Sequence, residues 1–591
     1  MPKTYLLTFF IFLYTHLGAA GQKNQFRTNL QGYLVNAPKT ALLCLMDDTE
    51  PDVFLLNTLT NSRIQTETSL IEKENWHPFK KYIKIDFSHV DAVGSYQLVT
   101  SDGKVNSNAF KIGNFPNWQE DVLGFMRSQR CGYNPYLDVY CHQKDGLSFY
   151  AEIPDSTEIN ATGGWHDAGD QLKYLITGSN ATARMLQAWF YQPDSFKDDF
   201  DHLGKPSPNG LPDILDEAKW GLDWIMNLHP SATQLYHQVA DDRDHRGFKL
   251  PHKDNADYGW GENSFRPVYQ ATGEPQGLGK YKSKATGMSN VAGRSAAALA
   301  LGFQAFSTFP VYQEYAQKCL IAARELYVLG QRKEGYQQGN SYGAPYRYEE
   351  NTWADDMEWA AAELAKSTGK KRFLKEARKY AKIINTWSWM ERDTASHYEM
   401  YPFVNMGHYA LWEAGNKKDK KTAITFYKHN LQRIKERAER NPYGAGHLFI
   451  WCSNNLAAAV ASQSILYKKM TGSSEFEALA INHINWLFGL NPWASSMITG
   501  IPENTDYPQD VHMPFWKILN KEVKGSLADG PLWSTIHENM LAIVLSEEDE
   551  YKELQPKHIK YHDDFADYST NEPTMDGSAD IILLLTYLNS N

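Results

Sequence analysis

The sequence predicts a mainly α-helical protein in which a small β-sandwich precedes a large α/α barrel. Between about residues 25 and 113, short segments such as residues 82–87 alternate apolar and polar side chains, as half-buried strands do. After residue 118 the apolar residues recur at helical spacing, for example at Ile214, Ala218, Leu222 and Ile225. At 591 residues the chain is too long for one ordinary core, so the two patterns indicate two domains.

The expected strands of the first domain are short and are separated by polar turns such as Ser101-Asp102-Gly103. They cover residues 41–46, 52–56, 81–87, 95–100 and 108–112. Roughly ninety residues of this kind suit a small sandwich of two sheets. We therefore place the sandwich at residues 22–113, a linker at 114–120 and the barrel at 121–591.

The second domain shows helix boundaries as well as helical periodicity. Pro212 stands just inside a helix start, and Gly369 and Gly472 follow helix ends, where glycine permits a left-handed cap. Further helices are expected at residues 289–306, 312–329, 354–366, 371–387, 455–470 and 474–488. Paired helices with long intervening loops indicate an α/α barrel whose loops build a cleft at one end.

The amino-terminal segment has the pattern of a secretory signal peptide. Lys3 precedes a mostly apolar run from Tyr5 to Leu17, and Gly18-Ala19-Ala20 supplies the small residues of a cleavage site. This run is too short for a membrane span, and no later stretch of the sequence approaches such a length. The sequence therefore predicts a signal peptide at residues 1–21 and a mature protein that is secreted or periplasmic, without a membrane span.

The composition argues against nucleic-acid binding and is compatible with a saccharide cleft. The net charge is −11, and no block of Lys and Arg interrupts it. The chain holds 17 Trp, 34 Tyr and 27 Phe, and aromatic rings stack on the flat C–H faces of sugars. A large helical core would use the same residues, so composition leaves both interpretations open.

A first acidic cluster reads Gly163-Gly164-Trp165-His166-Asp167-Ala168-Gly169-Asp170. The small residues allow a tight turn that can direct both carboxylates at one point. A water held between two carboxylates becomes an activated nucleophile, which is the general-base half of a hydrolysis. The alternative is structural, because Asp167 and Asp170 could cap a helix that begins near Gln171.

A second acidic cluster lies near the C-terminus, from Asp563 to Pro573. Its Glu572 lies among Phe565, Tyr568 and Pro573. A carboxyl group beside apolar surface keeps its proton to higher pH, as a general acid requires. The alternative is a solvated acidic loop.

The ordered motifs of the chain resemble those of glycoside hydrolase family nine, the cellulase family whose members often carry a leading immunoglobulin-like domain. The resemblance extends over nearly all of the chain after the signal peptide. The matching segments are Asn29-Leu30-Gln31-Gly32-Tyr33, Asn36-Ala37-Pro38-Lys39, Gly164 to Asp170, Asn209 to Trp220, Leu487-Phe488-Gly489-Leu490-Asn491-Pro492, Gly525 to Pro531, and Asp567-Tyr568 to Asn571-Glu572.

The resemblance implies an (α/α)₆ barrel and hydrolysis with inversion at the anomeric carbon. In the family pattern Asp170 is the general base, and Asp167 helps to hold the water. Glu572 is the acid that protonates the leaving oxygen, and Asp563 matches a further active-site acid. Inversion requires the acid and base carboxyl groups to stand roughly 6.5–9.5 Å apart.

Two cysteines and two histidines beside the first acidic cluster indicate a metal site. Cys131, Cys141, His142 and His166 form a ligand set that satisfies tetrahedral zinc, and a closed site of this kind is structural. Members of the resembled family with a leading immunoglobulin-like domain carry zinc at such a constellation. A disulfide between Cys131 and Cys141 is the alternative in a secreted chain.

Asp355 and Asp356 fall where the resembled family often binds calcium, for which oxygen ligands are suited. Two acidic residues at the start of a helix also complement its dipole. Calcium at Asp355 and Asp356 is therefore a second metal prediction, with that alternative.

The same resemblance indicates substrate contacts at His245, His512, Tyr568 and Trp165. The chain also departs from the family here, because a His-His-Arg run is replaced by His512-Met513-Pro514. Altered contacts beside the scissile bond make crystalline cellulose a doubtful substrate. They favour soluble β-glucans, cello-oligosaccharides or a branched glucan such as xyloglucan.

The leading hypothesis is an endo-acting β-1,4-glucanase. One alternative is an exo-acting hydrolase of the same family that acts on cellodextrins or amino-sugar oligomers. Another, from a different class, is a saccharide-binding protein without catalytic activity. Product sizes over time separate the first two, and hydrolysis itself separates both from the third. The sequence gives no prediction of oligomeric state.

Overall fold

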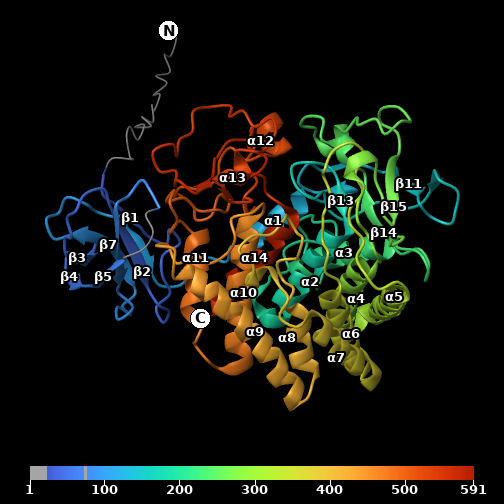
Figure 1. Cartoon of the computed structure of the whole chain (residues 1–591), viewed down its shortest axis with the longest axis horizontal. Helices are drawn as coiled ribbons and strands as arrows, with labels where there is room; N and C mark the ends of the chain where they lie inside the picture. The colour runs from blue at the N-terminus through green and yellow to red at the C-terminus, as the bar shows by residue number, and fades with distance from the viewer. Residues whose placement is uncertain (1–22, 72–75, 591) are drawn as a thin grey trace, which may run out of the picture.

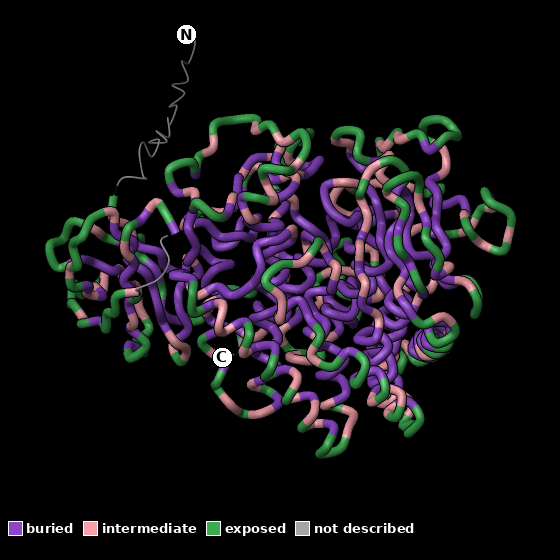
Figure 2. The backbone as a smooth tube through the Cα atoms, in the orientation of Figure 1, coloured by how far each residue is buried: buried purple, intermediate pink, exposed green. Residues whose placement is uncertain are grey.

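The computed structural model describes residues 23–71 and 76–590. The signal peptide predicted at residues 1–21 lies outside these described residues. A small β-domain at one side adjoins a large helical domain, and the buried residues concentrate inside both (Figures 1 and 2). The predicted fold class is therefore confirmed.

The first domain is a β-sandwich of two antiparallel sheets. One sheet has the order β1-β2-β6-β5, and the other has the order β4-β3-β7-β8. The strands are β1 (Gln25–Arg27), β2 (Thr40–Leu45), β3 (Val53–Asn57), β4 (Arg63–Gln65), β5 (Glu67–Ile71), β6 (Lys81–Asp86), β7 (Gly94–Thr100) and β8 (Phe110–Ile112). Leu43, Leu55 and Leu98 meet in the core between the sheets, so each sheet buries one face as an immunoglobulin-like sandwich does.

The second domain is a barrel of paired helices. The inner helices are α2 (Leu175–Tyr191), α4 (Ser289–Phe306), α6 (Ala354–Thr368), α8 (Met406–Ala414), α10 (Ser453–Thr471) and α14 (Met575–Ser590). The outer helices are α1 (Gln119–Ser128), α3 (Asp213–Asn227), α5 (Gln313–Arg332), α7 (Lys371–Ile384), α9 (Lys417–Ala438) and α11 (Glu477–Leu487). Helix α14 contacts both α2 and α10, which joins the carboxyl end of the barrel to its beginning.

The composition of each helix explains its place in the barrel. In α4 the run Ala296-Ala297-Ala298 is buried, and such small residues let neighbouring helices approach closely. In α7 only one stripe is buried, at Phe373, Ala377, Tyr380, Ala381 and Ile384. Helices buried nearly all round therefore form the inner ring, and amphipathic helices form the outer ring.

The predicted helix ends at Gly369 and Gly472 are confirmed. Both glycines have a left-handed backbone, with φ of 66° and 71°, and each donates its N–H to the carbonyl four residues earlier. Other helix ends shift by a few residues from the prediction; α7, for example, ends at Ile384 because Asn385 turns the chain at φ 51°.

A sheet within the helical domain was not predicted. Its order is β12-β11-β15-β14-β13, and β11 runs parallel to β15. The strands are β11 (Asp145–Phe149), β12 (Thr157–Glu158), β13 (Lys173–Tyr174), β14 (Tyr236–Val239) and β15 (Arg266–Gln270). This sheet joins the long loops before and after α2 and α3, and it positions the first acidic cluster.

The two domains are joined through segments that the sequence analysis singled out separately. Asn29 Nδ2 donates to Asn485 Oδ1 at 2.9 Å, and the Leu30 amide donates to the Phe488 carbonyl at 2.7 Å. The Arg27 guanidinium donates to the Pro492 carbonyl at 2.8 Å. The leading domain is thereby fixed against the end of α11.

We searched the helices of residues 23–71 and 76–590 for a possible membrane span. Within them, no helix is both long enough and apolar enough to span a bilayer.

Candidate active site

The first acidic cluster forms a tight loop that precedes α2. The Cys131 amide donates to the Gly164 carbonyl at 2.9 Å, and the His166 amide donates to the Gln129 carbonyl at 2.8 Å. Gly164 has φ 68°, and a Cβ there would lie 2.4 Å from the Trp224 ring, so only glycine fits. The Asp167 amide in turn donates to the Leu172 carbonyl at 2.9 Å, so the loop is fixed both before and after Asp167.

Asp167 lines the pocket and is almost fully buried. The hydroxyl groups of Thr177 and Tyr348 both donate to its carboxyl group. Burial raises the pKa of Asp167, and the nearby Asp576 and Asp170 raise it further. Because α2 begins only at Leu175, Asp167 does not cap that helix, and the structural alternative proposed for it is wrong.

Asp170 lies at the edge of the cleft with a partly exposed side chain. Its Oδ1 accepts the Leu172 amide at 2.8 Å, and its Oδ2 lies 3.3 Å from His245 Nε2. The His245 ring stacks on Tyr346, with ring centroids 4.2 Å apart. Burial lowers the pKa of the His245 imidazole, but the hydrogen bond to Asp170 and the negative charges of Asp170 and Asp244 together outweigh burial and raise this pKa. One oxygen of Asp170 thus orients the loop, and the other faces the cleft.

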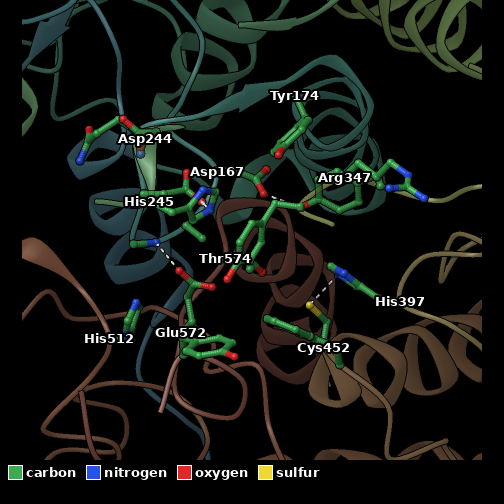
Figure 3. Close-up of a pocket in the computed structure, with 18 of the residues that line it drawn as sticks. Asp167, Tyr174, Asp244, His245, Arg347, His397, Cys452, His512, Glu572 and Thr574 are labelled. Carbon is green, nitrogen blue, oxygen red and sulfur yellow. Dashed lines mark hydrogen bonds and ion pairs between the residues drawn. The ribbon is translucent and has the colours of Figure 1, made fainter. Parts of the chain in front are cut away.

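Glu572 meets the same loop from the far end of the sequence. Its Oε1 accepts the Gly169 amide at 3.0 Å (Figure 3). A Cβ on Gly169 would lie 2.3 Å from the His512 carbonyl oxygen, so this close approach requires glycine. Burial raises the pKa of Glu572 well above its usual value, and the neighbouring Asp170 and Asp529 add to the effect.

Asp170 and Glu572 line one pocket of about 310 Å³. The loops that precede α2, α6, α8, α10 and α14 all contribute to its wall, so these inner helices begin on one face of the barrel. Aromatic and imidazole rings form much of that wall, and they come from Tyr174, His245, Phe248, Tyr346, Tyr348, His397, Trp451, His512 and Tyr568. The two acidic clusters, four hundred residues apart in the sequence, therefore share a groove with the surface that sugar rings require.

Three of the predicted substrate contacts line this pocket: His245, His512 and Tyr568. The Nδ1 of His512 hydrogen-bonds the Phe565 carbonyl, which directs the other side of the ring toward Phe248. The Tyr568 hydroxyl donates to the Leu541 carbonyl at 2.8 Å, so its ring is fixed from outside the pocket.

The predicted contact of Trp165 with substrate is wrong. Its side chain is 1% exposed, and its indole N–H donates to Glu217 Oε1 at 2.8 Å inside the barrel. Trp165 anchors the acidic loop to α3 through Glu217, and its side chain is not accessible to a sugar.

Asp563 does not line the described pocket. Its carboxylate accepts the amides of Gln509 and Asp510 at 2.7 and 3.0 Å and Asn571 Nδ2 at 2.9 Å. Burial raises its pKa to about 7. The structure thus places Asp563 as a loop anchor that joins the His512 segment to the residue before Glu572, rather than as a residue that touches the reacting atoms.

Cys131, Cys141, His142 and His166 meet in one cluster, and their ligand atoms lie within 4.8 Å of one another. Cys131 Sγ is 3.7 Å from His142 Nδ1, Cys141 Sγ is 4.0 Å from His166 Nε2, and the two imidazole nitrogens are 3.1 Å apart. Tetrahedral zinc would separate such ligands by roughly 3.3–3.8 Å. Both thiols are free, which contradicts the disulfide alternative, so this set fits a tetrahedral metal ion.

Charged residues around this cluster hold it in place. His142 Nε2 lies 3.2 Å from Asp254 Oδ2, the arrangement by which a carboxylate orients a metal-binding imidazole. Asp145 is paired with Arg266 at 2.7 Å and with Lys173 at 2.8 Å. Lys173 belongs to β13, so the cluster and the acidic loop are braced against the same sheet.

Asp355 and Asp356 do not fit the predicted calcium site. They lie near Glu350 in a buried group, but the Arg294 guanidinium is 2.8 Å from Asp356 Oδ1 and 2.7 Å from Glu350 Oε1. Burial and the nearby Glu350 raise the pKa of Asp355 to about 7. A guanidinium already supplies the positive charge of this cluster, and calcium would need six or more oxygen ligands in its place.

Several residues of the pocket wall were not predicted from the sequence. Tyr348 donates to Asp167, Trp451 and His397 form one side, and Tyr346 supports His245. Each lies in a loop before an inner helix, where periodicity carries no information. Their only sequence signal is that they precede helices whose starts share one face of the barrel.

This geometry provides the two carboxyl groups of a hydrolase in different environments. Glu572 is partly buried and has a raised pKa, which favours the protonated form, whereas Asp170 faces the cleft and can accept a proton from water. An acid and a base in one aromatic groove define a glycoside hydrolase.

The comparisons agree with this class. The family model described as Glycosyl hydrolase family 9 matches residues 115–585, and the Cellulase N-terminal ig-like domain matches residues 21–105. The chain therefore belongs to glycosyl hydrolase family 9, whose members hydrolyse with inversion. The recognition of the family and of an immunoglobulin-like leading domain is confirmed.

The chain is similar to several characterised proteins at low identity. Endoglucanase D of Acetivibrio thermocellus is 25% identical over 507 residues, which cover 81% of this chain and 73% of that protein. Xyloglucan-specific endo-beta-1,4-glucanase BoGH9A of Bacteroides ovatus is 22% identical over 545 residues, or 85% of each. The solved structure of a Zn-binding triple mutant of GH family 9 endoglucanase J30 has a TM-score of 0.73 at 23% identity, and covers 94% of this chain and 99% of that one.

Proposed function

We propose that this glycoside hydrolase cleaves internal β-1,4 bonds of soluble glucans by a single displacement with inversion. The observation that carries the proposal is the shared pocket of Asp170 and Glu572, with aromatic rings on its walls. The names of its relatives support the substrate class, since endoglucanases and a xyloglucan-specific endoglucanase are among them.

The two carboxyl groups divide the reaction between them. Asp170 accepts a proton from a water molecule, whose oxygen attacks the anomeric carbon from the side opposite the leaving group. Glu572 donates its proton to the glycosidic oxygen as that bond breaks. His245, held by Tyr346, keeps the Asp170 carboxylate directed into the cleft. The products are a sugar with an inverted anomeric centre and a free hydroxyl on the leaving chain.

Soluble glucans suit the wall around His512. The position after His512 holds Met513, whose side chain is buried with Val511 and Phe515, and Pro514 begins the short helix α12 (Pro514–Leu519). No cationic side chain follows His512 in this stretch of described residues before Lys517. On this side of the pocket the sugar is therefore expected to meet aromatic rings and the imidazole of His512, whose pKa is lowered by burial.

A product panel tests the proposal. We expect hydrolysis of xyloglucan, carboxymethyl cellulose and cello-oligosaccharides, with viscosity falling steeply for each reducing end released. Release of one short product without a fall in viscosity would instead support the exo-acting alternative. Binding of these glucans without hydrolysis would support the saccharide-binding alternative.

We propose that zinc occupies the site formed by Cys131, Cys141, His142 and His166. Four closed ligands make such an ion structural, and it would fix His166 and hence the loop that carries Asp167 and Asp170. The chemistry of the ligand set, the distances between its atoms and the Asp254–His142 contact support zinc.

For Cys141→Ser we expect loss of one bound zinc per chain and a fall in Tm of roughly 5 °C or more, because metal binding stabilises only the folded state. The rate of the chemical step in the remaining folded enzyme changes much less. Metal analysis and calorimetry check this, with Cys319→Ser as the control, since Cys319 is a buried thiol of the outer helix α5. Purified protein without zinc that yields a Cys131–Cys141 disulfide peptide would refute the assignment.

We also propose that the protein is exported. The pattern of residues 1–21 supports secretion or delivery to the periplasm, where polymeric glucans are met. Amino-terminal sequencing of the mature protein checks this, and we expect it to begin near residue 22; an intact Met1 on the native protein would contradict export.

A further inference from the structure

A buried carboxyl group outside the reacting pair, that of Asp529, lies behind one wall of the pocket. Its side chain is 3% exposed, and it belongs to the segment from Gly525 to Pro531. Asp529 is not among the residues that line the cavity, but Trp451, Cys452 and Glu572 are. Any effect of Asp529 on the reaction therefore passes through these neighbours.

Both carboxylate oxygens of Asp529 accept hydrogen bonds from that wall. The Trp451 indole N–H donates to Oδ2 at 2.7 Å, and the Cys452 thiol donates to Oδ1 at 3.2 Å. The backbone takes part as well, because the Asp529 amide donates to the Glu572 carbonyl at 2.9 Å. The Asn454 amide donates to the Asp529 carbonyl at 2.9 Å. One residue thus joins the start of α10 to the segment that carries the general acid.

The Trp451 ring forms a flat surface together with His397. Their ring centroids are 5.5 Å apart and their planes differ by 14°. His397 Nε2 also lies 3.5 Å from the Cys452 sulfur, a contact that Figure 3 shows at the edge of the pocket. Burial lowers the pKa of His397 to about 4, so it is a neutral ring at neutral pH. Trp451 and Cys452 therefore both donate to Asp529, and His397 contacts these two residues in turn.

The backbone of Cys452 makes this attachment specific. Cys452 has φ 59° and ψ 40°, a left-handed conformation that costs a residue other than glycine about 1 kcal/mol or more. Surrounding contacts have to hold it there, and the thiol–carboxylate contact with Asp529 is one that glycine could not make. The hydrogen bond to Asp529 thus helps to hold Cys452 in its left-handed conformation, although the two residues are 77 positions apart in the sequence.

We propose that Asp529 is a positioning residue that holds the wall of Trp451 and His397 against the bound glucan. Sugar rings stack on that wall, and its orientation depends on the two hydrogen bonds to Asp529. The hydrogen bond from the Asp529 amide to the Glu572 carbonyl fixes the position of this wall relative to the general acid. Removal of the carboxylate therefore weakens substrate binding more than it slows proton transfer. The inference rests on the proposed hydrolysis of β-1,4-glucans at this pocket.

Steady-state kinetics on cellopentaose test the proposal. For Asp529→Ala we expect KM to rise by about tenfold, because the two hydrogen bonds that orient the wall are lost, with kcat reduced by less. Asp529→Asn keeps one acceptor oxygen and restores part of the loss. Asp216→Asn is the matched control, a buried carboxyl of α3 away from the pocket, and we expect KM to stay unchanged.

A double-mutant cycle with Trp451→Phe shows whether Asp529 acts through the indole N–H. If it does, the two substitutions together raise KM by much less than the product of their separate effects. Independent effects, or an unchanged KM in Asp529→Ala, would overturn the proposal. Should Asp529→Ala fail to fold, the cycle is run with Asp529→Asn, and the same two outcomes decide.

Calorimetric binding separates this inference from the proposed function. In a Glu572→Gln background, we expect Asp529→Ala to weaken cellopentaose binding about tenfold. Wild-type protein that binds the sugar but does not hydrolyse it would refute the proposed function, and the binding effect of Asp529→Ala would still decide the role of Asp529. Equal binding with and without the Asp529 carboxylate would refute the inference alone.

Discussion

Replacement of Glu572 by glutamine is expected to lower kcat on a cello-oligosaccharide by about 10²–10⁴-fold, the range that a general acid contributes. Glutamine keeps the shape of the side chain and an oxygen that can accept the Gly169 amide. It has no proton to give to the leaving oxygen. Steady-state kinetics measure the loss, and calorimetry should show that sugar binding is retained. Turnover equal to that of the wild type would remove Glu572 from the acid role.

The same substitution should make the protein more stable at neutral pH. The pKa of Glu572 is raised in the folded state above its unfolded value of about 4.3, so above that pH the folded protein holds more protons than the unfolded chain. The free energy of unfolding therefore falls as pH rises through this window, and glutamine removes the cost. Tm is measured for the variant and the wild type at pH 4 and at pH 7. The increase in Tm caused by Glu572→Gln should be larger at pH 7 than at pH 4, and it would show that the variant loses activity without losing its fold.

The raised pKa of Glu572 also sets the alkaline limit of activity. A general acid works only while protonated, so kcat/KM falls as pH rises through the pKa of Glu572. Because burial and Asp170 raise this pKa, activity extends to higher pH than an ordinary glutamate would allow. A profile that already declined near pH 4–5 would contradict the raised pKa of Glu572.

Replacement of Asp170 by asparagine is expected to lower kcat by a similar factor of about 10²–10⁴. Asparagine can still accept the Leu172 amide through its oxygen, so the turn before α2 is preserved. It cannot take a proton from the attacking water. Circular dichroism and zinc content unchanged from wild type would show that the loop is intact.

The leaving group distinguishes the two variants. An aryl β-cellobioside with a good leaving group needs little protonation, so Glu572→Gln should recover much of its activity on that substrate. Asp170→Asn should not recover, because water still has no base. Recovery of both variants, or of Asp170→Asn alone, would contradict the assignment of acid and base.

Regular elements of the fold could be predicted closely from the sequence. The expected helix at residues 289–306 matches α4 (Ser289–Phe306), because its start, its apolar period and its end are all local signals. The caps at Gly369 and Gly472 were predictable for the same reason. The sheet of β11 to β15 was not, since its strands are short and pair across long loops.

The site could be predicted in part, through the resemblance more than through the residues alone. The meeting of Asp170 and Glu572 depends on barrel closure between α2 and α14, which no local pattern reveals. Trp165 and Asp563 stand in the right motifs, yet one is buried against Glu217 and the other anchors a loop. Asp355 and Asp356 do not fit a calcium site because Arg294, distant in sequence, pairs with Asp356 and with the neighbouring Glu350.

Residues such as Asp529 show a further limit of sequence reasoning. Its role depends on a hydrogen bond to Trp451 that spans 78 residues, and nothing in its own segment indicates a partner. Only the folded barrel brings the buried acid to the back of the cleft wall.

Asp170 and Glu572 together carry out a single displacement at the anomeric carbon, and proton NMR of freshly formed product shows whether they do. Cellopentaose is mixed with a high concentration of enzyme, and the anomeric signals of the new reducing ends are followed before mutarotation. We expect the α-anomer to form first, with the β-anomer growing only as the sugar equilibrates. A β-anomer that appears first would rule out a single displacement, because retention requires two displacements at the anomeric carbon.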